Sequence, residues 1–147
     1  MQLEVRPYQP EDYFEISRKE YDLLTFGTVG KPELISKQLC EGMAFTASCE
    51  KGLVACAGVL PVWKAVAEAW CIGSPLIQYF KFSFPKNVKK KLEEMINHYR
   101  LDRVQTVVDA EFIVSINWLE RMGFTYEGPM EKYIAGRTFF RYAWIRR

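Results

Sequence analysis

The sequence predicts an α/β fold with a mixed, mostly antiparallel central sheet of about seven strands and about four helices. Short apolar runs with a period of two alternate along the chain with longer runs that carry an apolar stripe of helical period. Strand–helix–strand units imply some parallel pairing, whereas strands joined by tight turns pair antiparallel. With 147 residues, the chain has the length of a single domain, which we expect to span residues 1–147.

The first part of the chain contains one predicted strand and two predicted helices. A short strand of alternating residues at 3–6 precedes a helix that opens at Pro10, because proline suits the first turn of a helix. This helix is expected to run through Leu24 and to end before Gly27. A second, shorter helix is expected from Lys31 to Gly42.

Three further strands follow in the middle of the chain. Residues 43–49 alternate in polarity, residues 50–52 form a turn, and Leu53–Leu60 is an apolar strand, so these segments predict a hairpin. Pro61 is expected to interrupt the ladder, because proline has no amide hydrogen to donate. Val66–Gly73 is the predicted fourth strand.

The second half begins with the clearest helix, Pro85–Arg100, which carries one apolar stripe. The segment 104–108 is the fifth strand, and Ile113–Met122 is a helix that Gly123 ends by adopting the left-handed conformation. Two last strands are expected at 126–134 and 138–145. Because a long helix joins the fourth and fifth strands, we expect them to be parallel and to splay apart at their C-terminal ends.

Composition excludes several classes of protein. No apolar run reaches the roughly 18–20 residues that span a bilayer, and the N-terminus has no basic and apolar signal pattern. The four cysteines form no C-x-x-C pair and there is one histidine, so a metal site is not expected and the thiols are predicted to be buried in a reducing compartment, the cytoplasm. Residues 75–147 carry a net charge of +5, which is too weak to predict nucleic-acid binding and is compatible with an anion site.

The run W-L-E-R-M-G-F at 118–124, after this order of elements, resembles the GCN5-related N-acetyltransferase (GNAT) superfamily, whose members carry a Y-E-K-L-G-F-like motif at the end of a helix. The resemblance implies the GNAT fold, acetyl-CoA as co-substrate and an amine or protein acceptor. The Glu68-Ala69-Trp70 run, the basic helix and the aromatic last strand also resemble phage-encoded GNAT-like proteins of the T7-type internal virion protein A family. That narrower resemblance implies a virion or host protein partner, and a location in the virion or the host cytoplasm.

The predicted cofactor loop departs from the GNAT pattern. GNAT enzymes hold the acyl-CoA pyrophosphate on backbone amides of a Q/R-x-x-G-x-G/A loop, but residues 74–87 contain no glycine and two prolines. Lysine side chains could supply the charge instead, or could form an ordinary solvated face of the helix. The candidate cofactor-binding residues are Ile72, Gly73, Ser74, Lys81, Lys86 and Lys90.

The catalytic groups are also incomplete. Leu119 stands where many GNAT enzymes have the tyrosine that protonates the leaving thiolate, and leucine cannot donate a proton. Tyr126 and Tyr133 are candidate replacements. Glu68 is the candidate base, because a carboxylate among aromatic neighbours has a raised pKa; alternatively, Glu68 points to solvent or pairs with a basic side chain.

Two functions therefore remain open. One is an acyl-CoA-dependent N-acetyltransferase with a degenerate cofactor loop and little turnover. The other is a non-catalytic phage virion-associated or host-interaction protein on a GNAT fold. The aromatic residues of the loop, Tyr79, Phe80, Phe82 and Phe84, belong either to the core or to an exposed patch for a partner. The last strand is apolar on both faces, which predicts that a helix or a second subunit of a homo-oligomer covers it.

Overall fold

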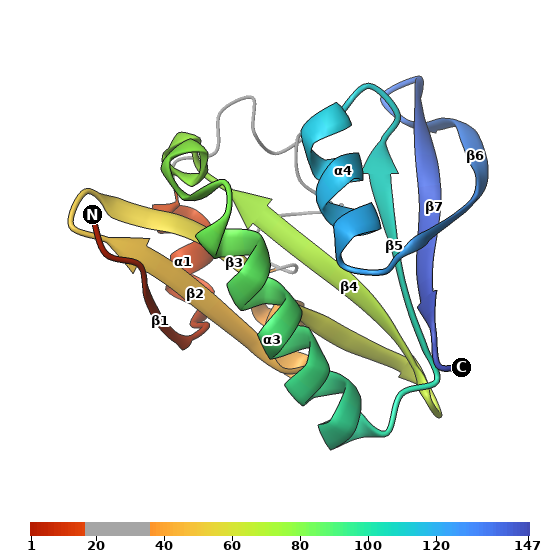
Figure 1. Cartoon of the computed structure of the whole chain (residues 1–147), viewed down its shortest axis with the longest axis horizontal. Coiled ribbons are helices and arrows are strands. Elements are labelled where there is room, and N and C mark those ends of the chain that lie inside the picture. The colour runs from red at the N-terminus through yellow and green to blue at the C-terminus, as the bar shows by residue number, and fades with distance from the viewer. Residues whose placement is uncertain (17–35) are drawn as a thin grey trace.

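The computed structural model describes residues 1–16 and 36–147. They form one seven-stranded sheet in the order β1-β2-β3-β4-β5-β7-β6, with α3 and α4 on the face turned toward the viewer and α1 behind it (Figure 1). Only β4 and β5 are parallel among these neighbours, and the other pairs are antiparallel. The predicted mixed, mostly antiparallel sheet is confirmed.

The first four strands are neighbours in chain order, and each pairs antiparallel with the next. Their bounds are β1 Glu4–Pro7, β2 Ala44–Cys49, β3 Gly52–Trp63 and β4 Val66–Gly73. The strand was expected to end at Leu60, but β3 continues to Trp63. The ladder is nevertheless irregular where the sequence predicted it, because a register shift lies between Pro61 and Trp63, as expected next to a residue that cannot donate to the ladder.

The first helix is shorter than its pattern suggests. Helix α1 covers Pro10–Glu15 and ends at Ile16, whose backbone is extended; the rest of the predicted helix lies outside the described residues. Of the second predicted helix, residues 31–35 also lie outside them. Residues 36–38 are helical, and the 3-10 helix η2, Leu39–Glu41, follows.

The second half follows the predicted order closely. Its elements are η3 Pro75–Phe80, α3 Ser83–Tyr99, β5 Arg103–Asp109, α4 Ile113–Arg121, β6 Thr125–Ile134 and β7 Arg137–Ile145. Gly123 follows α4 with a φ of +95°, which confirms the glycine stop. The 3-10 helix η3 was not predicted. Ser74 begins it by accepting a hydrogen bond from the Leu76 amide and donating one to the Leu53 carbonyl oxygen.

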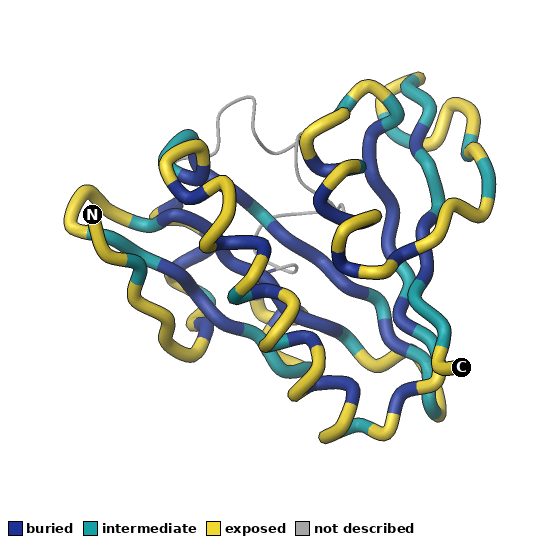
Figure 2. The backbone as a smooth tube through the Cα atoms, viewed as in Figure 1, coloured by how far each residue is buried: buried dark blue, intermediate teal, exposed yellow. Residues whose placement is uncertain are grey.

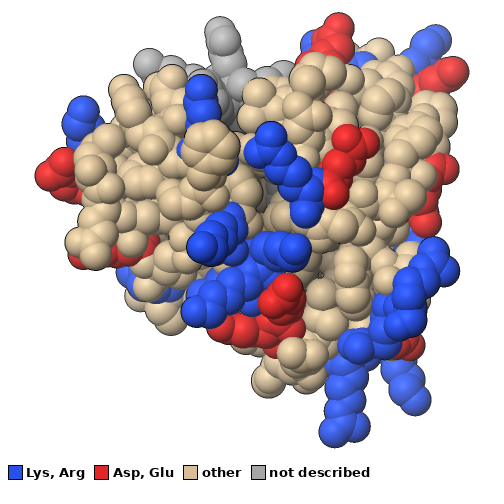
Figure 3. All heavy atoms as spheres, in the orientation of Figure 1, with Lys and Arg blue, Asp and Glu red and all other residues tan. Residues whose placement is uncertain are grey.

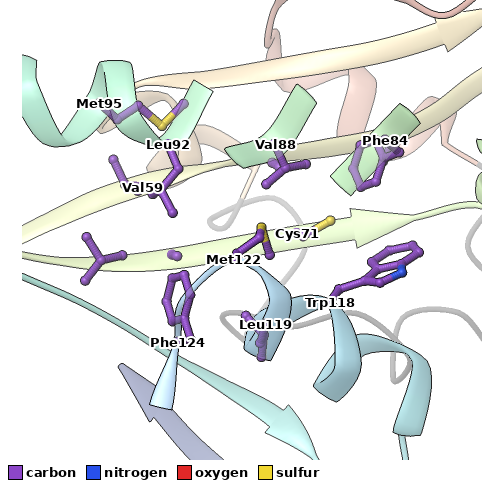
Figure 4. Packing of buried hydrophobic residues seen from close by; sticks show 14 of the residues in the cluster. Val59, Cys71, Phe84, Val88, Leu92, Met95, Trp118, Leu119, Met122 and Phe124 are labelled. Carbon is purple, nitrogen blue, oxygen red and sulfur yellow. The ribbon is translucent and has the colours of Figure 1, made fainter. Parts of the chain in front are cut away.

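The main core lies between the sheet and the two helices α3 and α4. Buried residues follow the central strands and the inner sides of these helices (Figure 2). Figure 4 shows side chains from α3 (Phe84, Val88, Leu92, Met95) on one side of Cys71 and side chains from α4 (Trp118, Leu119) on the other; Met122, which follows α4, belongs to the same cluster. A smaller cluster covers the opposite face, where Tyr8, Tyr13, Ile16, Leu39, Cys56 and Trp70 pack together.

The two clusters assign the faces of β4. Ala67, Ala69 and Cys71 belong to the main core under α3 and α4, whereas Trp70 belongs to the cluster on the α1 side. Because side chains alternate along a strand, Glu68 lies on the α1 side as well. Within the described residues, no helix is both long and apolar enough to cross a membrane.

Candidate functional site

Strands β4 and β5 form a fork. They pair only at their first residues, where Val66 lies opposite Arg103, Ala67 opposite Val104 and Glu68 opposite Gln105. Just past the last pair, the Thr106 hydroxyl donates to the Ala69 carbonyl oxygen at 2.8 Å. From there the strands diverge toward their C-terminal ends (Figure 1), which confirms the predicted splay.

A cleft of about 390 Å³ lies between η3 with the start of α3 on one side and α4 on the other. These helices follow the C-terminal ends of β4 and β5, the usual ligand-binding position next to parallel strands. The cleft is lined by apolar side chains (Ile77, Phe82, Phe112, Val114, Trp118), polar ones (Gln78, Ser115, Asn117) and the basic residues Lys81 and Arg121.

The aromatic residues at 79–84 were predicted to belong either to the core or to an exposed patch, and the structure shows two of them in each environment. Phe80 and Phe84 are buried in the core, whereas Tyr79 and Phe82 are exposed. Phe82 is 81% exposed and lines the cleft. A single exposed apolar side chain is common on protein surfaces, but its position in the cleft lining makes the ring of Phe82 accessible to a ligand there.

Among the described residues, the charged side chains that line the cleft are the basic ones of Lys81 and Arg121. In Figure 3, Lys and Arg side chains gather over α3 and beside α4 on this face of the molecule. Lys86 and Lys90 are exposed residues of α3, but neither lines the cleft. Of the three candidate lysines, the structure therefore brings one to the cavity.

The first turn of α3 offers few amide donors. Pro85 has no amide hydrogen, and the Lys86 amide donates to the Phe82 carbonyl oxygen. Phe82 is the N-cap of the helix and makes no side-chain capping bond. An anion in the cleft would therefore depend on side-chain cations more than on a nest of amides.

The three candidates at the end of β4 have structural roles. Ile72 is half-buried against the α1-side cluster, and Gly73 lies opposite Ala55 in the β3 ladder. The buried Ser74 hydroxyl is engaged with Leu53 and Leu76. None of the three lines the cleft.

Glu68 is held in an ion pair. Arg141 Nη1 lies 3.0 Å from Glu68 Oε1, and Gln105 Nε2 donates to Glu68 Oε2 at 2.9 Å. Pairing with a basic side chain was one of the alternatives that the sequence left open, and the geometry shows it. The role of Glu68 as a base stays a prediction.

The ion pair continues into a polar network on the same side of the sheet. Arg103 donates to Gln105 Oε1 at 2.8 Å and pairs with Glu127. Hydrogen bonding between these two partners raises the pKa of Arg103 and lowers the pKa of Glu127. The charges around the fork are thus fixed in matched pairs.

The residues considered for the leaving-group proton lie away from the cleft. Leu119 is fully buried in the core. Tyr126 packs edge-on against Phe140, and Tyr133 packs against Phe139. None of these residues lines the cleft.

One further tyrosine lies beneath α4. The Tyr142 hydroxyl donates to Glu120, and burial together with this bond raises the pKa of Tyr142 to about 12. Tyr142 does not line the cleft either.

In residues 1–16 and 36–147, no three His, Cys, Asp or Glu side chains lie close enough to hold a metal ion.

Sequence reasoning missed Arg121 and Asn117, although a signal for Arg121 was present. Val114, Trp118 and Arg121 follow one another at four and three positions in a predicted helix, so they share one face. That face is apolar at one end and basic at the other, which is the pattern of a cleft wall.

Neither a protein-family model nor a curated protein sequence matches the chain. Several solved structures do match the chain. Ribosomal-protein-S5-alanine acetyltransferase from Vibrio fischeri matches with a TM-score of 0.74 and 15% identity over 99% of this chain and 93% of that one. A GNAT-family acetyltransferase from Bacillus anthracis matches with a TM-score of 0.71 and 15% identity over 99% and 95%.

A variant of spermidine N-acetyltransferase from Vibrio cholerae matches with a TM-score of 0.69 and 12% identity over 97% of this chain and 94% of that one. None of these three is a phage protein by name, and nothing in the comparisons supports the resemblance to phage virion proteins. The element order, the forked parallel pair and these matches agree. The chain has the fold of the GNAT acetyltransferases.

Proposed function

We propose that this protein binds acetyl-CoA in the cleft between η3 and α4 and transfers the acetyl group to an amine. The observation that carries the proposal is the fork between β4 and β5, which lies beneath a cleft of about 390 Å³ with basic lining residues. The structures of the same fold named above are acetyltransferases by name, which supports this class of reaction.

The lining of the cleft has the chemistry that an acyl-CoA requires. Lys81 and Arg121 would hold the diphosphate, to which a guanidinium can bind in two-point fashion. Gln78 and Asn117 each carry one donor and one acceptor group for the amides of the pantetheine arm. The exposed ring of Phe82 would stack against the adenine.

The reaction itself joins the amine nitrogen to the thioester carbonyl carbon and breaks the carbon–sulfur bond. An ammonium acceptor gives up one proton to solvent before attack, and the second proton that it loses ends on the departing thiol. In this proposal, an acceptor on the α1 side would meet the thioester at the fork, where β4 and β5 separate. Among the described residues that line the cleft there is no tyrosine, histidine or cysteine, so within this part of the chain the thiolate would leave without a general acid of the usual kind.

A second candidate is a GNAT-fold protein that binds acetyl-CoA without turnover. The buried Leu119 and the paired Glu68 favour it. The virion or host partner and the virion location that the sequence suggested have no supporting observation of their own. An amine or protein acceptor, a homo-oligomer and a cytoplasmic location stay predictions.

Calorimetry with acetyl-CoA, combined with a thiol-release assay over a panel of amines, tests the proposal. Binding with measurable thiol release supports the transferase, and binding without release supports the second candidate. An absence of heat at millimolar acetyl-CoA would exclude both.

A further inference from the structure

The ion pair between Glu68 and Arg141 occupies the vertex of the fork. Glu68 and Gln105 are the last paired residues of the β4–β5 ladder, so the strands begin to separate immediately beyond them. The alternation of side chains places the pair on the α1 side of the sheet, opposite the cleft. An acceptor that approaches the fork from this side would therefore meet both charges at once.

Glu68 and Arg141 differ in how many of their hydrogen-bonding atoms have a partner. Both carboxylate oxygens of Glu68 accept hydrogen bonds, from Arg141 and from Gln105. A guanidinium has five N–H donors, yet within residues 1–16 and 36–147 only Nη1 of Arg141 has a hydrogen-bond partner. The Arg141 side chain is 25% exposed and that of Glu68 is 19% exposed, so a small ligand can reach both.

Within residues 1–16 and 36–147, the acidic side chains that flank the fork are themselves paired with arginines. Glu127 is paired with Arg103, and the buried Asp109 is paired with Arg137 at 2.6 Å. A polyamine requires unpaired carboxylates along its length, because each ammonium needs its own counter-charge. Of these two acidic groups, Glu127 pairs with Arg103 beside the vertex, and Asp109 is paired at the open end of the fork, where β5 ends.

We propose that the acceptor is a zwitterionic amine of the α-amino-acid class, which binds with its amino group toward Glu68 and its carboxylate on Arg141. This inference rests on the proposed acetyl transfer and names its substrate class. An α-amino acid carries opposite charges a few bonds apart, which match two opposite charges that lie 3.0 Å apart. The carboxylate takes up the free Arg141 donors and the amine is left beside the fork.

The test measures acceptor binding and acetyl-CoA binding separately. L-α-amino acids, their carboxamides and spermidine are titrated by calorimetry into the protein saturated with free CoA, which cannot react. The parent is expected to prefer each amino acid to its carboxamide. Acetyl-CoA affinity, measured on its own, reports whether the proposed function itself holds.

The matched variants are Arg141→Gln and Arg146→Gln, both compared with the parent for thermal unfolding. Arg141→Gln is expected to weaken amino-acid binding by roughly 10–100-fold, the equivalent of one charge-assisted hydrogen-bond set. It should also improve spermidine binding, because Glu68 loses its partner, and a merely structural role would not invert the preference. Arg146 follows the end of β7, three residues after Ala143, the partner of Gln105, and its side chain contacts Asp102 and the Leu101 carbonyl oxygen rather than Glu68. Its variant should therefore keep the parent's preference for amino acids, whatever its effect on thermal unfolding.

Parent protein that binds carboxamides or spermidine as tightly as amino acids, with acetyl-CoA binding intact, would overturn the inference. An unchanged preference in a folded Arg141→Gln variant would overturn it as well. If Arg141→Gln fails to fold, the preference of the parent still decides the matter.

Discussion

The Thr106 hydroxyl donates a hydrogen bond to the Ala69 carbonyl oxygen at 2.8 Å, one residue beyond the last paired residues of β4 and β5. Both residues are buried. A threonine side chain thus satisfies a carbonyl group that the missing ladder would leave without a donor. The bond marks the point from which the fork opens, and it allows the strands to separate without leaving that group unpaired.

Thr106→Val removes this bond while keeping the side-chain volume. We expect it to lower the free energy of unfolding by about 1–3 kcal/mol, since the Ala69 carbonyl becomes a buried group without a partner. Chemical denaturation measures the loss. Thr125→Val, at an exposed position of β6, is the control and should change stability by less than about 0.5 kcal/mol; equal effects of the two variants would contradict the role of the bond.

The cleft predicts which cations bind acetyl-CoA. The double variant Lys81→Gln, Arg121→Gln should lower its affinity by roughly 10–100-fold and flatten the dependence of binding on salt, because two phosphate contacts are lost. The pair Lys86→Gln, Lys90→Gln removes the same charge from residues outside the cleft and should have an effect several times smaller. Calorimetry at two salt concentrations measures both; the reverse order would move the anion site onto the outer face of α3.

Turnover should be low even where acetyl-CoA binds. A positioned general acid contributes about 10²–10⁴-fold to a rate, and the residue at the usual position, Leu119, is buried in the core. Thiol release by the parent should therefore fall short of that of a GNAT enzyme with the tyrosine by about this factor. Fast turnover that Glu68→Gln abolishes would contradict the expectation and establish Glu68 as the base.

Asp12 should make stability depend on pH. Burial by itself would raise the pKa of Asp12, but hydrogen bonds from Arg6, the Gln9 amide and Thr46 outweigh burial and hold the pKa below its ordinary value. A carboxylate with a lowered folded-state pKa contributes stability above its unfolded pKa of about 3.9, and this contribution is lost as the pH falls through the folded value.

Asp12→Asn should therefore cost about 2 kcal/mol at pH 7, and the difference from the parent should shrink as the pH falls below about 4. Urea denaturation at pH 7, 5 and 3 measures it. Glu11→Gln, at the exposed neighbouring position, should cost little at any pH. A difference that grows toward acid pH would be inconsistent with this assignment.

Two of the cysteines should resist alkylation in the native protein. Burial raises the pKa of Cys56 to about 12 and raises that of Cys71 as well, so neither forms the reactive thiolate at neutral pH. The prediction of buried thiols is wrong for Cys40, which is exposed. Cys40 should react first with iodoacetamide, which mass spectrometry of the labelled protein would detect. In denaturant all four should react; rapid native labelling of Cys71 would show that the core opens.

Much of the fold could be read from local pattern. The fourth strand ends at Gly73 as predicted, and Gly123 stops α4, because hydrophobic period and glycine conformation act over a few residues. The 3-10 helix η3 could not be predicted in this way. It depends on the Ser74 hydroxyl reaching Leu53, a contact across 21 positions of the chain.

The contacts of the candidate site could not be predicted either, because they join residues that are far apart in the sequence. The Arg141 partner of Glu68 lies 73 positions away, and no spacing rule pairs the two. Lys81 was recognisable as a cation near the loop, whereas its counterpart Arg121 required knowing that η3 and α4 face one another. Helical periodicity alone could have placed Arg121 on the face of Trp118, but not opposite Lys81.

Hydrogen–deuterium exchange with and without acetyl-CoA tests the central claim most directly, because it reports where on the chain the ligand binds. The account predicts slower exchange in peptides that cover η3, the start of α3 and α4, at residues 75–86 and 112–121. Protection absent from both segments, or confined to the groove beside β1 that Arg6 and Lys91 line, would contradict it.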